Sequence, residues 1–409
     1  MNSLSNVMRD RRLIILLIAN ISSSIGTGIT MIAVPWLLVN RENGEEIYGY
    51  AALSVTIFLF FLSPYIGVLV DRYSRKAILL LNEWTGMLIV ACFAIAGFLA
   101  GEFHTWHLIG IYMGGTLYYT IHYPAQFAFN QEIFERSQYR TLNSVMEIQS
   151  QVASMVAGGL ASLVIERTDL SILLLMDATT HIIGLTLLFI IPYSTSNSSR
   201  TTVRISMFSD MKEGFSYLKG RPLLVLFYIS SLMPFIGVMV GNYLWPIYIA
   251  KNLQADATVL GLADMIYAIG AVLAGFTIPL MMKRWGAYIT VFLSVTIFTV
   301  GLLIAAWTTI IVIFLSLKIL LGWGNSGARV ARNTVMMDLV PNALIGRVNS
   351  FFSAVGMGMR VVLVSLFTQS IHYTGASISL TIVGILLIVS ILGVIMSRSI
   401  LQRDYSSQG

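Results

Sequence analysis

Charged residues are scarce in this chain, and cysteine and histidine are rarer still. Only 11% of its 409 residues are charged, against about 25% in an ordinary soluble protein. The single cysteine, Cys92, excludes a disulfide framework and the paired-cysteine spacing of a zinc site. The five histidines form no metal-ligand or Ser–His–Asp pattern, and the sequence has no Walker A segment. These absences argue against an enzyme, and we expect no metal and no bound cofactor.

Apolar residues take the place of charge, and they come in long runs. Hydrophobic residues make up 56% of the chain, and one membrane span needs roughly 20 apolar residues. The net charge of +6 lies between the runs, which favours contact with an anionic lipid bilayer over contact with nucleic acid. We therefore predict an all-α membrane protein. Its twelve expected transmembrane helices lie near residues 13–39, 47–70, 77–100, 106–129, 142–165, 171–192, 222–249, 258–281, 287–307, 309–331, 347–371 and 375–397.

A polar gap and an internal repeat predict two related halves. The longest polar stretch, Tyr193 to Arg221, falls in the middle of the chain. A shift of 206 residues lays the Asn143-Ser144 pair on the Asn349-Ser350 pair. Parallel halves of this kind are one known plan of membrane transporters, with the substrate site between the halves. We expect two pseudo-symmetric bundles of six transmembrane helices, with the boundaries 1–192 for the N-terminal bundle, 193–221 for a cytoplasmic linker and 222–409 for the C-terminal bundle.

The distribution of basic residues predicts the orientation in the membrane. Most lysines and arginines lie in the N-terminus, the linker, the C-terminus and the loops that alternate with them on one side. The opposite loops hold only Arg41, Arg167 and Lys251. Cytoplasmic loops carry an excess of Lys and Arg. We expect a multi-pass protein of the cell membrane with both termini in the cytoplasm.

One loop motif carries a family resemblance. The segment after the second expected helix reads Gly67-Val-Leu-Val-Asp71-Arg72-Tyr-Ser-Arg75-Lys76. It resembles the loop signature of the major facilitator superfamily, Gly-x-Leu-x-Asp-Arg-x-x-Arg-Lys. Two other segments, 211–218 and 346–350, together with Asp177, are similar to the branch that holds macrolide efflux proteins and the enterobactin exporter. The resemblance implies the major facilitator fold and a monomer that moves a small-molecule substrate by alternating access.

The same loop is expected to act as a conformational latch. A carboxylate at Asp71 can cap a neighbouring helix N-terminus and pair with Arg72 or Arg75, which closes the cytoplasmic side. Opening would then break these contacts. Gly67 and Lys76 complete the motif. The alternative is that these charges only orient the chain in the membrane.

Cations inside an expected membrane helix point to a binding site. A lysine or arginine at mid-span costs roughly 2.5–3.5 kcal/mol, so such residues usually face a cavity or a partner. In the helix near 309–331, cationic, amide and glycine residues are spaced three or four positions apart and share one helical face. They are Lys318, Gly322, Asn325, Arg329 and Arg332. Arg360 adds a cation in the next helix. The alternative for Arg329 and Arg332 is that they extend to the nearer membrane surface.

The repeat maps this cationic face onto a tyrosine-rich face in the first half. Subtracting 206 gives Tyr112, Thr116, Tyr119, Tyr123 and Gln126. The resemblance places both helices around a central cavity, so we expect cationic donors on one wall and tyrosines on the other. Such walls suit an amphipathic molecule with an anionic group, while Tyr112 and Tyr118 could simply pack. The predicted substrate-binding residues are Tyr119, Tyr123, Gln126, Lys318, Asn325, Arg329, Arg332 and Arg360.

Four acids lie within expected helices and could carry a proton: Glu83, Glu147, Asp177 and Asp264. Glu147 is the first candidate for proton coupling, with an ion pair to an embedded arginine as the alternative. Asp177 is the second candidate, and a structural role in hydrogen bonding between helices is its alternative. Glu83 and Asp264 are expected near the membrane surface.

These observations lead to one functional hypothesis with two alternatives. The primary hypothesis is a secondary active exporter, driven by the proton gradient, of an amphipathic small molecule with anionic groups of the siderophore type. Macrolide or multidrug efflux is the first alternative. Uptake of an anionic nutrient, which the same cationic wall would serve, is the second.

Overall fold

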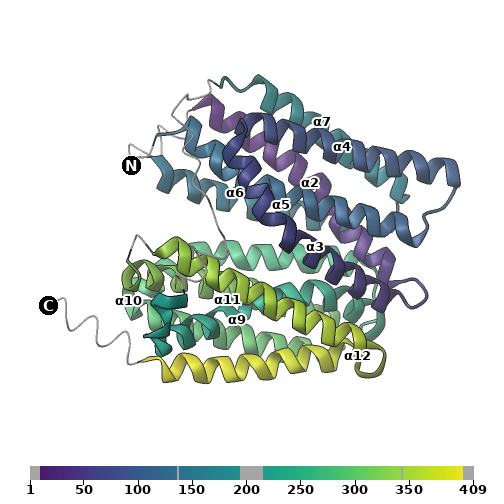
Figure 1. Ribbon diagram of the computed structural model, residues 1–409. Coiled ribbons are helices and arrows are strands. Elements are labelled where there is room, and N and C mark those ends of the chain that lie inside the picture. The colour runs from purple at the N-terminus through teal and green to yellow at the C-terminus, as the bar shows by residue number, and fades with distance from the viewer. Residues whose placement is uncertain (1–9, 136–137, 194–214, 342–343, 399–409) are drawn as a thin grey trace. The chain divides into compact units, whose positions relative to one another are not determined.

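The computed structural model describes residues 10–135, 138–193, 215–341 and 344–398, without the side chains of Asp71, Arg140 and Thr141. Most of the predicted linker over 193–221, including the start of the 211–218 segment, lies outside this range. All regular elements of the described residues are helices (Figure 1). In chain order they are α2 (Arg11–Val39), α3 (Gly44–Arg72), α4 (Arg75–Ala100), α5 (Thr105–Ile133), α6 (Tyr139–Val164), α7 (Leu170–Ile190), α9 (Pro222–Ile247), the π-helix η2 (Tyr248–Asn252), α10 (Ala257–Ala305), α11 (Ile311–Leu339) and α12 (Ile345–Met396).

The length of these helices fits a membrane protein. A helix of 29 residues, such as α2, is about 43 Å long, which is more than the roughly 30 Å of a bilayer's hydrocarbon core. Within the described residues, eight helices are long and apolar enough to cross a membrane. Helices satisfy their own backbone hydrogen bonds, which is why they suit lipid. The chain is a helical, multi-pass membrane protein.

Two glycines interrupt the longest helices. Gly286 in α10 has φ 82° and ψ 162°, and Gly375 in α12 has φ 67° and ψ 176°. Positive φ is accessible to glycine at little cost because glycine has no Cβ. Gly286 lies between the predicted spans 258–281 and 287–307. Gly375 is the first residue of the predicted span 375–397, which follows the span 347–371. The prediction of twelve separate transmembrane helices stays a prediction.

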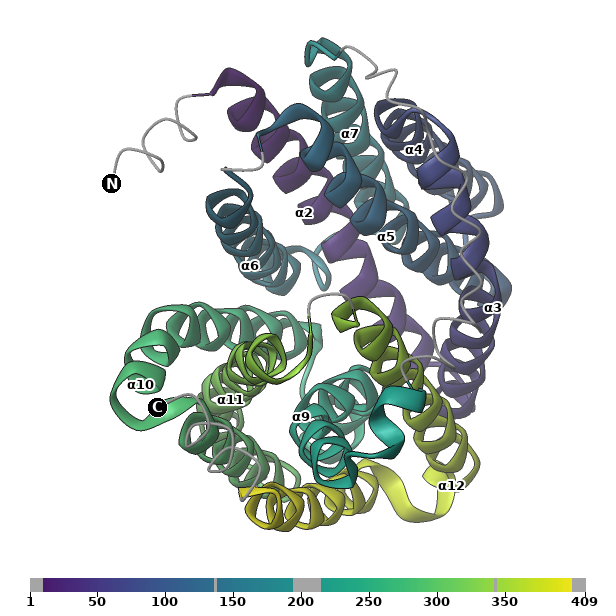
Figure 2. The same ribbon diagram turned by 60° about the vertical axis from the view of Figure 1, so that its left-hand side comes forward.

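The chain forms two compact units, which are described separately. The first comprises residues 1–203 and 256–265, and the second comprises residues 204–255 and 266–409. In the first unit, α7 packs against both α2 and α4, and both views show these helices side by side (Figure 2). A buried apolar cluster joins these helices to α5, with Leu13, Leu16, Leu79, Phe129 and Leu188 among its members.

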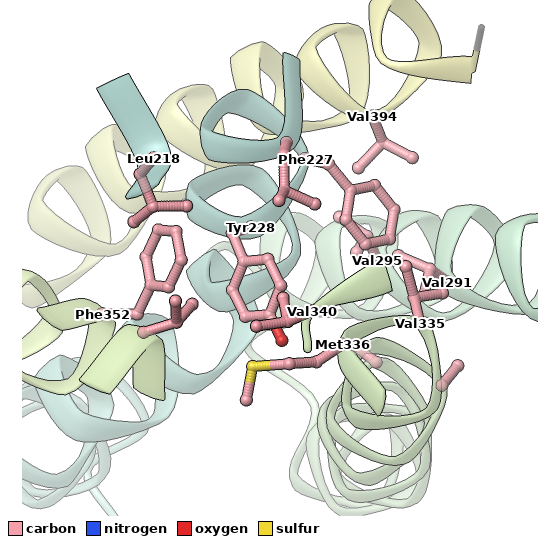
Figure 3. Packing of buried hydrophobic residues seen from close by; sticks show 14 residues of the cluster. Leu218, Phe227, Tyr228, Val291, Val295, Val335, Met336, Val340, Phe352 and Val394 are labelled. Atoms are coloured by element: carbon pink, nitrogen blue, oxygen red, sulfur yellow. The ribbon is translucent and has the colours of Figure 1, made fainter. Parts of the chain in front are cut away.

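An apolar cluster in the second unit fixes the orientation of α11 (Figure 3). Phe227 and Tyr228 of α9 meet Val335 and Met336 of α11 in this cluster. The ring of Tyr228 stacks on Phe352 of α12, with centroids 4.3 Å apart and planes 17° from parallel. Such stacked pairs are worth about 0.5–1.5 kcal/mol beyond the area they bury. Packing on this side of α11 determines which of its polar residues approach α9 and α10.

Candidate functional site

Lys318 of α11 is buried in the second unit, where aromatic rings surround its ammonium group. Its Nζ lies 3.9 Å from the ring centroid of Trp245 in α9 and 5.1 Å from that of Phe314. The residue is only 2% exposed. A cation over the face of an aromatic ring is attracted by the ring quadrupole, more strongly where water is excluded. The Lys318 side chain therefore ends inside the unit instead of extending to a membrane surface.

Asn325 and Arg332 lie on the same face of α11 as Lys318. Asn325 donates from Nδ2 to the Tyr267 hydroxyl of α10 at 2.8 Å, and its Oδ1 is buried without a hydrogen-bond partner. Arg332 donates from its guanidinium to the Ser231 carbonyl of α9 at 3.0 Å and is 8% exposed. Extension of Arg332 to the membrane surface is therefore wrong, because the side chain is turned inward to α9. The sequence spacing correctly grouped these three residues.

The other predicted members of this face are less enclosed. Arg329 is half-buried. Gly322 lies so close to α10 that a Cβ atom there would be 2.0 Å from the Tyr267 carbonyl oxygen, which explains the glycine in the series. Arg360 of α12 is half-buried, and its Nε is buried without a hydrogen-bond partner. A buried donor without a partner costs about 1–3 kcal/mol. The Nε group of Arg360 is such a donor, and binding an acceptor there would remove this cost.

The predicted tyrosine face of α5 lies in the first unit. The rings of Tyr119 and Tyr123 stack with centroids 5.6 Å apart and planes 13° from parallel. Tyr123 is 55% exposed, whereas Gln126 is buried with its Nε2 3.2 Å from the sulfur of Met146. Tyr112 is buried edge-to-face against Tyr48, which confirms its packing role. The expectation that this face and the α11 face line one cavity stays a prediction.

The two proton-coupling candidates have very different surroundings. Glu147 of α6 is exposed and accepts a hydrogen bond from Gln151 at 3.3 Å. Asp177 of α7 is 1% exposed and accepts hydrogen bonds from two hydroxyls of α2, Thr30 at 2.7 Å and Thr27 at 3.3 Å. One Asp177 oxygen also lies 3.5 Å from Nε2 of His181, one turn further along α7.

Glu83 has surroundings that the sequence did not predict. It is only 1% exposed inside the first unit, while the expectation that it lies near the membrane surface stays a prediction. Its Oε2 lies 2.7 Å from Nδ1 of His181 and accepts from the Ser23 hydroxyl at 2.8 Å. Its Oε1 accepts from the Tyr118 hydroxyl at 2.7 Å. Tyr118 is therefore more than a packing residue. Asp264 is exposed.

Glu83, His181 and Asp177 thus form one connected set, called here the acid–histidine network. The imidazole of His181 stands between the two carboxylates, with a different ring nitrogen toward each. This geometry holds the carboxylates apart and does not gather them around a point. In agreement, no group of three or more His, Cys, Asp or Glu in the described residues could hold a metal ion. The i, i+4 spacing of Asp177 and His181 was a visible signal, but nothing local links either residue to Glu83.

Three glycines allow the helices to close around this network. A Cβ atom at Gly26 of α2 would lie 2.1 Å from the Thr180 hydroxyl. At Gly184 of α7 it would lie 2.3 Å from the Ser23 hydroxyl, and at Gly86 of α4 it would lie 2.8 Å from the His181 ring. Small residues let membrane helices approach closely. Helices α2, α4 and α7 therefore meet closely enough for side chains from all of them to share hydrogen bonds.

The basic end of the loop motif ties α4 to α5 and α7 within the first unit. Arg75 forms an ion pair with Glu132 of α5, and Tyr193 donates a hydrogen bond to the same carboxylate. Lys76 donates to the carbonyl oxygens at the end of α7, at 2.9 Å to Phe189 and 2.7 Å to Ile191. Burial and the hydrogen bond to Glu132 raise the pKa of Tyr193, so its hydroxyl stays a donor. Glu132 is a partner that the motif alone did not predict.

The other latch residues, Gly67, Asp71 and Arg72, lie in the last turns of α3. Arg72 is exposed, and a Cβ atom at Gly67 would meet nothing within 4 Å. The side chain of Asp71, predicted to cap a helix and pair with Arg72 or Arg75, lies outside the described residues. The role of the motif as a latch stays a prediction.

The Arg75–Glu132 pair gives a prediction for stability. Replacing either residue by alanine leaves a largely buried charge without its partner, and we expect a loss of about 1–3 kcal/mol in the free energy of unfolding. The double variant Arg75→Ala/Glu132→Ala should lose less than the sum of the single variants. Unfolding of the purified protein in detergent measures all three. Fully additive losses would mean that the two side chains do not interact.

Comparisons with known proteins agree with this fold. A family model described as the Major Facilitator Superfamily matches residues 16–244 and 227–406. Two relatives in Bacillus subtilis strain 168 are the uncharacterised MFS-type transporters YfiS and YvqJ, 20% and 22% identical over 237 and 261 residues. The matches cover 57% and 62% of this chain but only 55% and 61% of the relatives, so less than two thirds of each relative is spanned.

Solved structures are similar over nearly the whole chain. A bacterial homologue of the iron transporter ferroportin, in its inward-facing state, has a TM-score of 0.70 at 15% identity and covers 95% of this chain and 98% of its own. A variant of the nucleoside transporter NupG has a TM-score of 0.72 at 13% identity, with coverage of 95% and 100%. At such low identity these structures share the fold alone. The chain belongs to the major facilitator superfamily and is a membrane transporter, not an enzyme.

Proposed function

We propose that this transporter is a proton-coupled exporter of an amphipathic small molecule with anionic groups, of the siderophore type. It works as a monomer by alternating access, with twelve transmembrane helices and both termini in the cytoplasm of the cell whose plasma membrane it spans. The helix interruptions at Gly286 and Gly375 support the twelve-helix arrangement. The loop motif and the segments similar to macrolide efflux proteins and the enterobactin exporter support export.

The buried polar face of α11 is the observation that carries the substrate proposal. Lys318, Asn325 and Arg332 hold cationic and amide groups inside the second unit. Charged groups within a membrane protein are expensive and mark substrate or ion pathways. Arginine and lysine donors favour carboxylate, catecholate or phosphate oxygens. Arg360, with its unused Nε donor, adds to this preference.

Aromatic rings within each unit support the amphipathic part of the proposal. Trp245 and Phe314 border the Lys318 ammonium group, and the Tyr119–Tyr123 stack ends in a half-exposed ring. Flat rings of a ligand can stack on such side chains. A catecholate chelator combines both features, because it carries anionic oxygens on aromatic rings. The same rings also favour the alternative of macrolide or multidrug efflux.

Proton coupling is supported by acids that lie within the helices of the first unit. Asp177 is buried among hydroxyls, and Glu147 lies in α6 beside Gln151. A carboxyl group in such a place can take up and release a proton as access alternates between the two sides. Substrate binding and proton binding would then involve residues of different units.

Transport into inside-out membrane vesicles tests this function. With an acidic lumen, we expect a tris-catecholate chelator to accumulate more than erythromycin or ethidium, and a protonophore should abolish the accumulation. Unchanged accumulation after the gradient is collapsed would contradict proton coupling. Preferred accumulation of erythromycin would favour macrolide efflux, and uptake only by right-side-out vesicles would favour the nutrient alternative.

A further inference from the structure

The acid–histidine network has a charge that its surroundings do not balance. Each of the three side chains is 1–2% exposed. With His181 protonated, two carboxylates and one imidazolium leave a net charge of −1. Burying an unbalanced charge in a low-dielectric interior costs several kcal/mol. One more proton would bring the network to neutrality.

The groups that face the network come from four helices, and none of those described is a lysine or an arginine. From α2 come the hydroxyls of Ser23, Thr27 and Thr30. Helix α5 contributes the Tyr118 hydroxyl, and the remaining partners are the network's own residues on α4 and α7. In the described part of the chain, no lysine or arginine is among the partners of Glu83 or Asp177. The titratable neighbours are Tyr118, Tyr119 and His122 of α5, together with the network itself.

The hydrogen-bond pattern provides a place for that proton. Both ring nitrogens of an imidazolium are donors, whereas a neutral imidazole has one donor and one acceptor. When the ring is an imidazolium, it can donate from Nδ1 to Glu83 at 2.7 Å and from Nε2 to the Thr27 hydroxyl at 3.3 Å, and that hydroxyl donates to Asp177. When it is neutral, one carboxylate faces an acceptor nitrogen, and a protonated carboxyl group there restores the hydrogen bond. Glu83 and Asp177 are therefore connected through the His181 ring and the Thr27 hydroxyl, a route along which a proton can pass.

The network lies deep within the helices, and a buried polar series leads away from it. Glu83 is eight residues from the start of α4, or about 12 Å along the axis. The ring of Tyr118 stacks on that of His122, with centroids 5.2 Å apart. His122 is 2% exposed, and its Nδ1 has no hydrogen-bond partner. Gln126 follows one turn later on the same buried face of α5.

We propose that the acid–histidine network of Glu83, His181 and Asp177 is the proton-binding centre of this transporter. It takes up one proton on a carboxylate oxygen of Glu83 or Asp177, and releases it when the helices rearrange. The Tyr118–His122 pair lies on the path between the centre and the rest of α5. The assignment rests on the proposed proton coupling. It gives the proton-binding role to Glu83, His181 and Asp177 instead of the exposed Glu147.

Infrared difference spectroscopy against pH tests proton binding without any substrate. The reconstituted wild-type protein should show the C=O band of a protonated, buried carboxyl group that titrates with pH. The band should be lost in Glu83→Gln or Asp177→Asn and kept in Glu147→Gln and in Glu102→Gln, whose side chain is 73% exposed. A band that survives in both Glu83→Gln and Asp177→Asn would overturn the assignment. Tyr118→Phe, which removes a single hydroxyl, should move the titration to higher pH even where Glu83→Gln fails to fold.

Transport in proteoliposomes then separates this inference from the proposed function. For a tris-catecholate chelator, Glu83→Gln should reduce gradient-driven accumulation by about tenfold or more while counterflow exchange continues. Equal gradient-driven accumulation by Glu83→Gln and wild type would overturn the inference and leave the proposed function intact. A wild-type protein with the titrating band but no gradient-driven accumulation would overturn the proposed coupling and leave the proton-binding centre supported.

Discussion

Replacing Lys318 by methionine is expected to weaken the binding of an anionic tris-catecholate probe by about tenfold to a hundredfold, because a hydrogen bond to a charged group is worth about 1.5–3 kcal/mol. Methionine keeps a flexible chain of similar length beside Trp245 and Phe314 but carries no charge. Erythromycin, whose tertiary amine is protonated at neutral pH and which has no carboxylate, should bind the variant at least as well as the wild type. Lys318→Arg should recover part of the affinity.

Lys283 provides the matched control for this experiment. It is an exposed lysine of α10, so Lys283→Met removes the same charge from the protein without touching the α11 face. Binding is measured by intrinsic tryptophan fluorescence or calorimetry on the purified protein in detergent. Equal losses for the tris-catecholate and for erythromycin, or equal losses in Lys318→Met and Lys283→Met, would show that Lys318 does not recognise the anionic group.

A large effect on stability is expected at Gly26, where an added methyl group would enter the acid–histidine network. The Cβ atom of Gly26→Ala would lie 2.1 Å from the Thr180 hydroxyl and 2.7 Å from an Asp177 oxygen. Overpacking of this kind costs about 1–3 kcal/mol, and sometimes more. The free energy of unfolding in detergent should therefore fall by at least that amount, and Gly184→Ala, with a contact of 2.3 Å to the Ser23 hydroxyl, should behave similarly.

Gly358 of α12 is the control for the glycine variants, because a Cβ atom there would meet nothing within 4 Å. Alanine is favoured over glycine in a helix by up to about 1 kcal/mol, so Gly358→Ala should be neutral or slightly stabilising. If Gly26→Ala and Gly358→Ala unfold with the same free energy as the wild type, the close approach of α2 and α7 at the network is not essential to the fold.

Local spacing was enough to predict one half of the candidate site. Residues 318, 325 and 332 are seven apart, close to two helical turns, so they share a face in any regular helix. Charged side chains are costly in lipid, so we expected this face to be turned toward the interior of the protein. The structure adds what spacing cannot supply, namely the rings of Trp245 and Phe314 around Lys318 and the Ser231 carbonyl at Arg332.

The other half depends on contacts between residues far apart in the chain. Glu83 and His181 are separated by 98 positions, and Arg75 and Glu132 by 57. A single acid in an apolar run looks the same whether it lies at a membrane surface or faces a histidine of another helix. The sequence therefore did not reveal the partners of Glu83. Glu147, chosen for its depth along the chain, lies on an exposed part of α6, because depth along a helix does not say which way a side chain points.

In the proposed function, substrate and protons move in opposite directions through this protein. The most direct test traps a pH-sensitive dye inside proteoliposomes and adds a tris-catecholate chelator outside, with no pH gradient imposed. Entry of the chelator down its own gradient should drive protons out, so the lumen should become more alkaline than in protein-free liposomes. If labelled chelator enters while the lumen pH follows that of protein-free liposomes, transport is not coupled to protons and the proposal is wrong.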